Sequence, residues 1–161
     1  MSYPGDGEVS AVLRSGGDVP TLTVGGTTAR LVAPGSLTGE RYGLFRWDMP
    51  VRAGGATPHF HRTFSESFYV LSGTVELYDG ARWMPAGEGD FLYVPEGGVH
   101  GFRNDTDVPA SMLILFAPGP PRERYFAELA ELLASGRQMG DAERSAWLAR
   151  HDQYSVAEGP S

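Results

Sequence analysis

The sequence predicts an all-β fold, a barrel or sandwich of short strands with helices near its C-terminal end. The first observation behind this prediction is a series of short apolar runs separated by turn signals such as Ser72-Gly73 and Asp79-Gly80. The second is that 22 glycines and 12 prolines are scattered between these runs in a chain of 161 residues. The third is a change of pattern at Pro118, after which apolar residues recur at helical spacing. A chain of this length forms one domain with one core.

Strands are expected wherever an apolar run is bounded by turn residues. The N-terminal segment, residues 1–40, is expected to join the barrel or a dimer interface, and it contains three runs: Val9 to Arg14, Thr21 to Val24 and Ala29 to Val32. The barrel core is expected over residues 41–118 and contains the others: Tyr42 to Met49, Ser67 to Leu71, Thr74 to Tyr78, Arg82 to Met84, Phe91 to Val94, His100 to Asn104 and Ala110 to Phe116.

Residues 119–154 are expected to form two helices packed on the outside of the barrel. Pro121 suits a first helical turn and Gly136 a C-terminal stop, and between them apolar residues recur at helical spacing: Tyr125, Phe126, Leu129, Leu132 and Leu133. A second, weaker helix is expected from Asp141, a plausible N-cap, to about His151. Residues 155–161 are expected to be a frayed tail.

Charge and composition exclude several classes of partner. The net charge is −7 and the sequence pI about 5.0, so nucleic acid is an unfavourable partner. We expect no membrane insertion, because no apolar run approaches the roughly 20 residues that cross a bilayer. The opening MSYPGDGE lacks the basic and apolar regions of a secretion signal, and we expect a cytoplasmic protein. The chain has no cysteine, so any metal must be held by nitrogen and oxygen.

Three of the four histidines lie in two compact clusters. His59 and His61 are two residues apart, so in a strand their imidazoles share a face, and Glu66 begins the next strand, from which its carboxylate can reach back. His100 leaves a tight turn built by Pro95 and Gly97. Three neutral imidazoles and one carboxylate suit one divalent transition metal per chain: Fe, Mn, Ni, Co, Cu or Zn. The alternative is a set of surface or core histidines without a metal.

These clusters resemble the two motifs of the cupin superfamily, Gly-x5-His-x-His-x4-Glu-x6-Gly and Gly-x5-Pro-x-Gly-x2-His-x3-Asn. The second is matched in full by Gly89, Pro95, Gly97, His100 and Asn104. The first is matched by His59, His61, Glu66 and Gly73, but Ala53 stands where the leading glycine is expected. The resemblance implies a jelly-roll β-barrel with metal ligands His59, His61, Glu66 and His100. Within the superfamily the chain is most similar to small bacterial proteins that resemble quercetin 2,3-dioxygenase.

Residues beside the ligands are candidates for a substrate pocket. By alternation, Phe68 and Val70 share the face of Glu66, and Phe102 and Asn104 share the face of His100. We expect these side chains to line the pocket, and Phe68, Val70 and Phe102 are the candidate substrate-binding residues, with core packing as the alternative. Asn104 is expected to anchor a turn instead.

Two charged or titratable residues outside these clusters are expected to lie at the surface. Arg46 is expected to be solvated, with an inward-facing arginine that holds an anionic substrate as the alternative. His151 lies between Arg150 and Asp152 in the second helical segment and is expected to be a surface residue.

The leading functional hypothesis is a metal-dependent dioxygenase that acts on a small enolic or aromatic molecule. Glu66 is expected to be catalytic as a base, although a purely metal-binding role stays open. The alternatives are a non-oxidative metal-dependent cyclase, isomerase or lyase, and a cupin that binds a small molecule without turnover. We also expect a homodimer, because the N-terminal strands and the C-terminal helices exceed what one minimal barrel requires.

Overall fold

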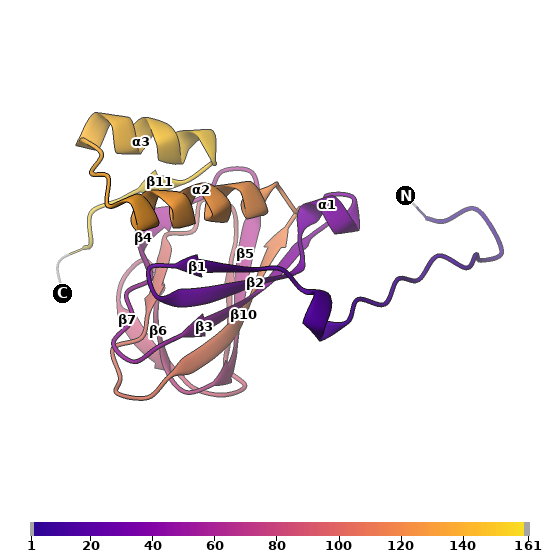
Figure 1. Ribbon diagram of the computed structural model, residues 1–161, viewed down its shortest axis with the longest axis horizontal. Helices are drawn as coiled ribbons and strands as arrows, with labels where there is room; N and C mark the ends of the chain where they lie inside the picture. Colours follow the sequence, from indigo (N-terminus) through magenta and orange to yellow (C-terminus); the bar gives the residue numbers. More distant parts are fainter. Residues whose placement is uncertain (1, 160–161) are drawn as a thin grey trace.

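Two antiparallel sheets face each other in the computed structural model, which describes residues 2–159 (Figure 1). The six-stranded sheet has the order β1 (Thr21–Val24), β2 (Thr27–Ala33), β3 (Gly43–Met49), β10 (Ala110–Ala117), β5 (Ser65–Ser72) and β8 (Phe91–Val94). The five-stranded sheet has the order β11 (Tyr154–Ser155), β4 (Ala56–Phe60), β9 (His100–Arg103), β6 (Val75–Tyr78) and β7 (Trp83–Ala86). The predicted jelly-roll fold class is confirmed.

The core lies between the sheets, where the inward-facing side chains of the long strands are buried. On β3, Phe45, Trp47 and Met49 are buried, whereas Arg46 projects outward and pairs with Asp48 at 2.8 Å. Arg46 is therefore the surface arginine that we expected. The paired strands β10 and β5 fill the same space with fully or almost fully buried side chains: Phe68, Val70, Met112, Ile114 and Phe116.

Two helices, α2 (Arg122–Ser135) and α3 (Asp141–Arg150), lie along one side of the sheets, at the top of the view in Figure 1. Helix α2 contacts β1 of one sheet, and α3 contacts β11 of the other. Phe126 of α2 packs on Phe45 and Trp47, with ring centroids 5.3 and 5.0 Å apart. Helix α2 ends at Gly136, whose φ of 66° is the left-handed conformation that glycine adopts without strain.

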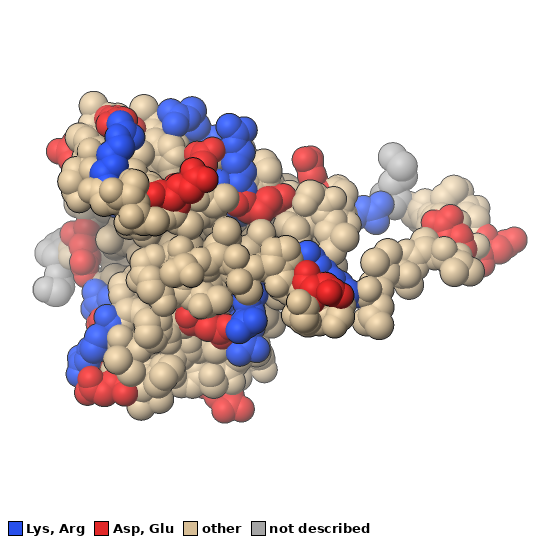
Figure 2. Space-filling view, viewed as in Figure 1, with Lys and Arg blue, Asp and Glu red and all other residues tan. Residues whose placement is uncertain are grey.

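Two short helical segments complete the described elements. A 3-10 turn, η1 (Gly16–Asp18), precedes β1, and α1 (Gly35–Thr38) connects β2 to β3. Among residues 2–159, no helix is long and apolar enough to span a membrane. Acidic and basic side chains are interspersed over the face shown in Figure 2, and this face has no broad basic patch.

Three expectations about the chain ends and caps are wrong. Residues Val9 to Arg14 form no strand but lie in an extended arm that leaves the body (Figure 1). Within this stretch Arg14 bonds back, to the carbonyls of Leu31 and Val32. The tail is not frayed at Ser155, because Tyr154–Ser155 pair with β4 as β11. Asp141 is the first helical residue of α3, and Gly140 is the N-cap. Residues 160–161 of the predicted tail lie outside the described residues.

Candidate metal centre

The structure brings together all four predicted metal ligands. His59 lies on β4, His61 directly after it, Glu66 on β5 and His100 at the start of β9. Their candidate ligand atoms all lie within 4.8 Å of one another, and all four residues are buried. The register explains part of this convergence, because His59 lies opposite His100 in the β4–β9 pair. Glu66 reaches the same point from the facing sheet.

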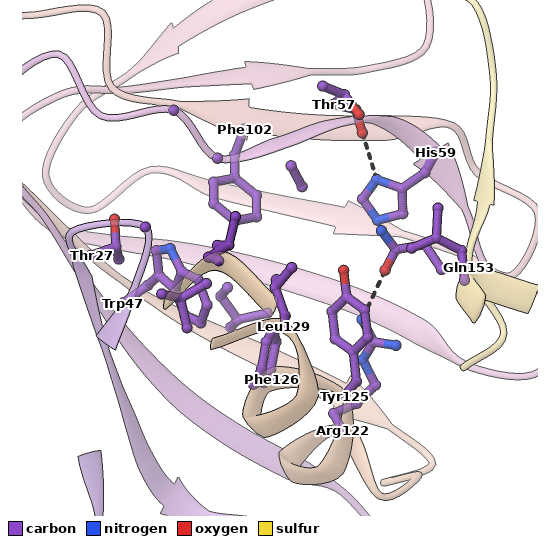
Figure 3. A pocket seen from close by; sticks show the side chains of 18 of the residues that line it. Thr27, Trp47, Thr57, His59, Phe102, Arg122, Tyr125, Phe126, Leu129 and Gln153 are labelled. Atoms are coloured by element: carbon purple, nitrogen blue, oxygen red, sulfur yellow. Dashed lines mark hydrogen bonds between the residues drawn. The ribbon is translucent and has the colours of Figure 1, made fainter. Parts of the chain in front are cut away.

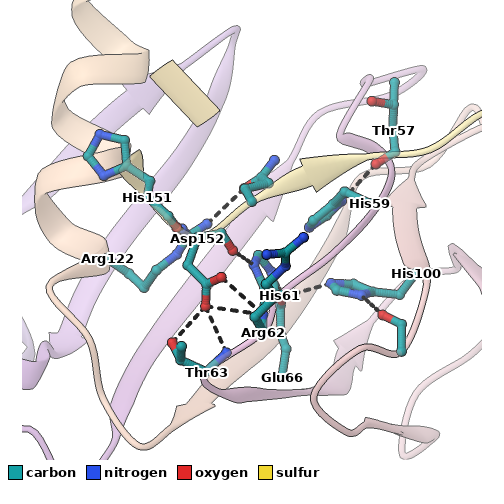
Figure 4. Close-up of polar contacts among 12 residues, drawn as sticks. Thr57, His59, His61, Arg62, Thr63, Glu66, His100, Arg122, His151 and Asp152 are labelled. Atoms are coloured by element: carbon teal, nitrogen blue, oxygen red, sulfur yellow. Dashed lines mark hydrogen bonds and ion pairs between the residues drawn. The ribbon is translucent and has the colours of Figure 1, made fainter. Parts of the chain in front are cut away.

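Each imidazole is oriented by a hydrogen bond from Nδ1 to a backbone carbonyl (Figure 4). His59 bonds the carbonyl of Thr57 at 2.7 Å, His61 that of Asp152 at 2.6 Å and His100 that of Gly98 at 3.0 Å. Since a carbonyl only accepts, each Nδ1 carries a proton, and in the neutral form of each imidazole Nε2 presents a lone pair. This is the arrangement found around histidines that bind a metal.

The electrostatics of the cluster fit a divalent cation. The Nε2 atoms of His61 and His100 lie 3.0 and 2.7 Å from the same Glu66 Oε2. With Nδ1 already protonated, both could donate to Glu66 only as neighbouring cations. A divalent ion would remove this conflict, because the Nε2 lone pairs and the carboxylate could bind it together. Burial, followed by the charge of His100, lowers the pKa of His59 to about 3, so that imidazole is neutral and available as a ligand.

Burial alone would raise the pKa of Glu66. The charge of His100 and the hydrogen bonds from His100 and His61 outweigh this and hold the pKa well below its usual value. Burial likewise opposes the rise in the pKa of His100, but the charge of Glu66 and its hydrogen bond prevail. The carboxylate is therefore ionised, which is the form that binds a metal.

A cavity of about 290 Å³ opens from the cluster toward the helices (Figure 3). His59 and Glu66 lie in its wall, together with an apolar surface formed by Trp47, Phe102 and Leu129. The exposed residues of its lining come from the β1–β2 turn, the loop before β4, β4 itself, the two helices and β11: Gly25, Gly54, Gly55, Thr57, Leu133, Arg144 and Ser155. The mouth of the cavity therefore lies between these segments.

The three predicted substrate-binding residues have different positions. Phe102 lines the cavity, whereas Phe68 and Val70 are fully buried and are not part of its lining. The Phe68 ring lies 5.8 Å from the rings of His100 and Phe102, so it packs beneath the ligand cluster. This position agrees with the packing alternative, and a role of these residues in substrate binding stays a prediction.

The sequence predicts a turn anchor at Asn104 and a surface position for His151. Asn104 is fully buried, and its Nδ2 donates to the carbonyls of Pro50 and Val108, so it is the turn anchor that we expected. The surface assignment of His151 is wrong. Its side chain is 11% exposed, and its Nε2 lies 2.8 Å from Glu128 Oε2, because α3 packs its last turn against α2.

Several site residues could not be identified from the motifs. Arg122, Tyr125 and Gln153 are buried in the cavity wall, and the carbonyl of Asp152 orients His61. Helical spacing held a signal for Arg122, which precedes Tyr125 and Phe126 by three and four positions and so shares their buried face. No sequence pattern indicates Asp152, which is 91 residues from His61 along the chain.

Comparison with known proteins relates the central strands to one family. Residues 45–116 match the family model described as "Cupin domain". A curated relative, quercetin 2,3-dioxygenase of Bacillus subtilis, is 31% identical over 115 residues, which cover 71% of this chain but only 33% of that protein. The chain thus spans about one third of the length of this relative.

Two solved structures have a similar fold. A sugar phosphate isomerase from a cupin superfamily of Silicibacter pomeroyi is 26% identical, with a TM-score of 0.52 over 59% of this chain and 61% of that one. KdgF from Halomonas sp. is 18% identical, with a TM-score of 0.62 over 71% of this chain and 99% of that one. At this identity the second likeness describes the fold alone.

Proposed function

The chain contains a cupin domain, and on that premise we propose that it is a metal-dependent dioxygenase that acts on a small enolic or aromatic molecule. The observation that carries the proposal is the buried set of three imidazoles and one carboxylate at the wall of an apolar cavity. The similarity to a quercetin 2,3-dioxygenase supports oxygen chemistry over the other reactions that this fold hosts.

Different residues of the chain would bind the metal and enclose the substrate. His59, His61, Glu66 and His100 would hold one divalent transition metal, and such an ion supplies Lewis acidity and, for Fe, Mn, Ni, Co or Cu, a redox step. Phe102, Trp47 and Leu129 would exclude water from one face of the substrate. The cavity volume of about 290 Å³ lies near the low end of small-molecule sites, roughly 300–1,000 Å³, which favours a small substrate.

Glu66 is the candidate base. It lies in the cavity wall as well as against the imidazoles, so its carboxylate can accept a proton from a substrate hydroxyl. The anion of an enol or phenol is richer in electrons than the neutral molecule, so it reacts more readily with an oxidant. In the alternative role, Glu66 only binds the metal and balances its charge.

A non-oxidative isomerase, cyclase or lyase is the second candidate. The similarity to a sugar phosphate isomerase favours this candidate, because the same ligand set can polarise a carbonyl without dioxygen. A cupin that binds a small molecule without turnover is the third candidate.

Dioxygen uptake separates the first candidate from the others. The metal-loaded protein would be mixed with a panel of flavonols, diketones and polyketide phenols, and uptake and products would be measured in air and under nitrogen. Products that need air support the dioxygenase, and products that form equally under nitrogen would instead support the isomerase, cyclase or lyase. Binding without any product would leave only the third candidate.

A variant tests the role of Glu66. Glu66→Gln keeps an oxygen that can approach the metal but has no basic carboxylate, so we expect much of the metal to remain. Turnover should fall by about 10² to 10⁴, the usual contribution of general base catalysis. A rate near that of the native protein, on a substrate that the native protein converts, would reduce Glu66 to a ligand.

A further inference from the structure

Arg122 is a buried cation without a carboxylate partner. Its side chain lies in the cavity wall at the start of α2, and the residue is 4% exposed. One terminal nitrogen donates to the carbonyl of His151 at 2.9 Å and the other to Gln153 Oε1 at 3.0 Å. Both acceptors are neutral, and among residues 2–159 the Nε atom has no hydrogen-bond partner. A buried charge in this state is costly unless something else compensates it.

The aromatic surroundings stabilise this cation only in part. The guanidinium carbon lies 4.0 Å from the centroid of the Tyr125 ring, with Phe116 at 5.3 Å. Burial lowers the pKa of Arg122, but a guanidinium stays charged in a protein. The charges of Glu66 and Asp152 act on it only from a distance, without an ion pair.

The charge of the loaded site would also be positive. Glu66 supplies one negative charge against the two of a divalent ion, and the three imidazoles are neutral as ligands. The loaded centre thus keeps one positive charge, to which Arg122 adds a second. In a cavity with an apolar wall, this excess favours an anionic ligand.

The unpaired polar atoms of the cavity wall are donors. Three buried side-chain atoms of the described chain have no partner, and the two that belong to cavity-lining residues are Arg122 Nε and Trp47 Nε1. The Tyr125 hydroxyl also points into the cavity (Figure 3). Burial raises the pKa of Tyr125, so this hydroxyl keeps its proton and can donate. A ligand that satisfies these groups must bring acceptor oxygens.

We propose that Arg122 and Tyr125 form an anion-binding wall beside the metal ligands and that the cavity selects a small planar acid, with a carboxylate or an acidic enol. The anionic oxygen would lie against these two side chains, and the flat apolar body against Phe102 and Leu129. The inference rests on the proposed function, because the wall belongs to the same cavity, and it names the charge of the substrate.

Benzoate and benzamide are the probes, since they share a shape and differ in charge. Their affinities for the metal-loaded protein would be measured by calorimetry and by the fluorescence of Trp47 and Trp147, which both line the cavity. We expect benzoate to bind about tenfold more tightly than benzamide, the effect of one charge-assisted hydrogen bond. Equal affinities would overturn the inference.

Gln153→Glu separates the contribution of the Arg122–Tyr125 wall from that of the metal, because Gln153 contacts both side chains. Gln153 already accepts a hydrogen bond from Arg122, so a glutamate of the same shape gives the cation an internal partner and leaves the ligand set unchanged. Benzoate affinity should fall by about tenfold, and benzamide affinity should not change. Arg122→Gln should act in the same way if it folds. Arg124→Gln, at an exposed position of the same helix, is the matched control and should bind like the native protein.

The outcomes separate this inference from the proposed function. Unchanged benzoate affinity in Gln153→Glu would overturn the anion wall even where dioxygen uptake holds. The protein could prefer benzoate to benzamide and lose this preference in Gln153→Glu, yet contain no metal and show no turnover. That result would support the anion-binding wall and contradict the proposed function. Metal analysis of every variant would check that the ligand set is preserved.

Discussion

The imidazoles of the metal centre are positioned by main-chain carbonyls, and the carbonyl for His61 comes from the far end of the chain. Asp152 accepts from His61 Nδ1 through its backbone and from the backbone nitrogens of Arg62 and Thr63 through its carboxylate, at 3.0 and 2.8 Å (Figure 4). Asp152 has a φ of 52°, a left-handed conformation that Asp and Asn tolerate better than most residues. One residue thus fixes both a ligand and the loop that carries it.

Replacing Asp152 should weaken metal binding without removing a ligand. Asp152→Ala loses the acceptors for Arg62 and Thr63 and is strained at positive φ, so His61 would be less well oriented. We expect metal affinity to fall by about 10-fold to 100-fold, the usual cost of losing such support. Competition with a chelator measures it.

Two further variants serve as comparisons for Asp152→Ala. Asp152→Asn tolerates the same backbone and keeps one acceptor oxygen, so it should give an intermediate loss. Asp107→Ala removes an exposed carboxylate that pairs with Arg52 and should change nothing. Native affinity in Asp152→Ala would show that His61 does not need this support.

Features that depend on residues close together in the sequence could be predicted from the sequence. Strand alternation places His59 and His61 on one face, and the resemblance of both clusters to the cupin motifs adds Glu66 and His100 to the same site. The end of α2 at Gly136 was predictable from the residues around it. Arg122 and Asp152 were not, because their roles depend on where the helices dock. The arm at residues 9–14 was mistaken for a strand because apolar content does not guarantee a neighbouring strand.

The contact between α2 and α3 should depend on pH through Glu128. Hydrogen bonds from His151 and Trp147 lower the pKa of Glu128 from 4.5 to about 2. Since the folded state has the lower pKa, the stabilisation is complete above about pH 4.5 and is lost as pH falls toward about 2. Between these values, the melting temperature of the native protein should fall more steeply than that of Glu128→Gln.

A neighbouring residue provides the control for this titration. Glu131→Gln changes an exposed carboxyl on the same helix and should keep the native pH dependence. Identical slopes for the native protein and Glu128→Gln would show that this carboxylate does not stabilise the helix pair.

At the scale of the whole molecule, one outer face of the six-stranded sheet suggests self-association. Tyr69, Phe91, Tyr93 and Leu115 are 44%, 64%, 57% and 36% exposed on the neighbouring strands β5, β8 and β10. Strand β8 is also the edge of its sheet. Exposed apolar patches and free edges are common features of interfaces.

We therefore predict a homodimer that covers this face. Light scattering should give a mass near twice the 17.4 kDa of one chain, and Phe91→Glu should shift the protein toward the monomer. Glu88→Gln, a change in the exposed turn before β8, should leave the mass unchanged. A mass near 17.4 kDa for the native protein at all micromolar concentrations would contradict the dimer.

Elemental analysis of protein purified without chelator tests the metal centre most directly. We expect about one transition-metal ion per chain, because three oriented imidazoles and one ionised carboxylate meet at a single point. His61→Ala and His100→Ala should lose most of this metal, and His151→Ala should retain it. A metal content near zero, with no rebinding on dialysis against Mn, Fe, Ni or Zn, would contradict the account.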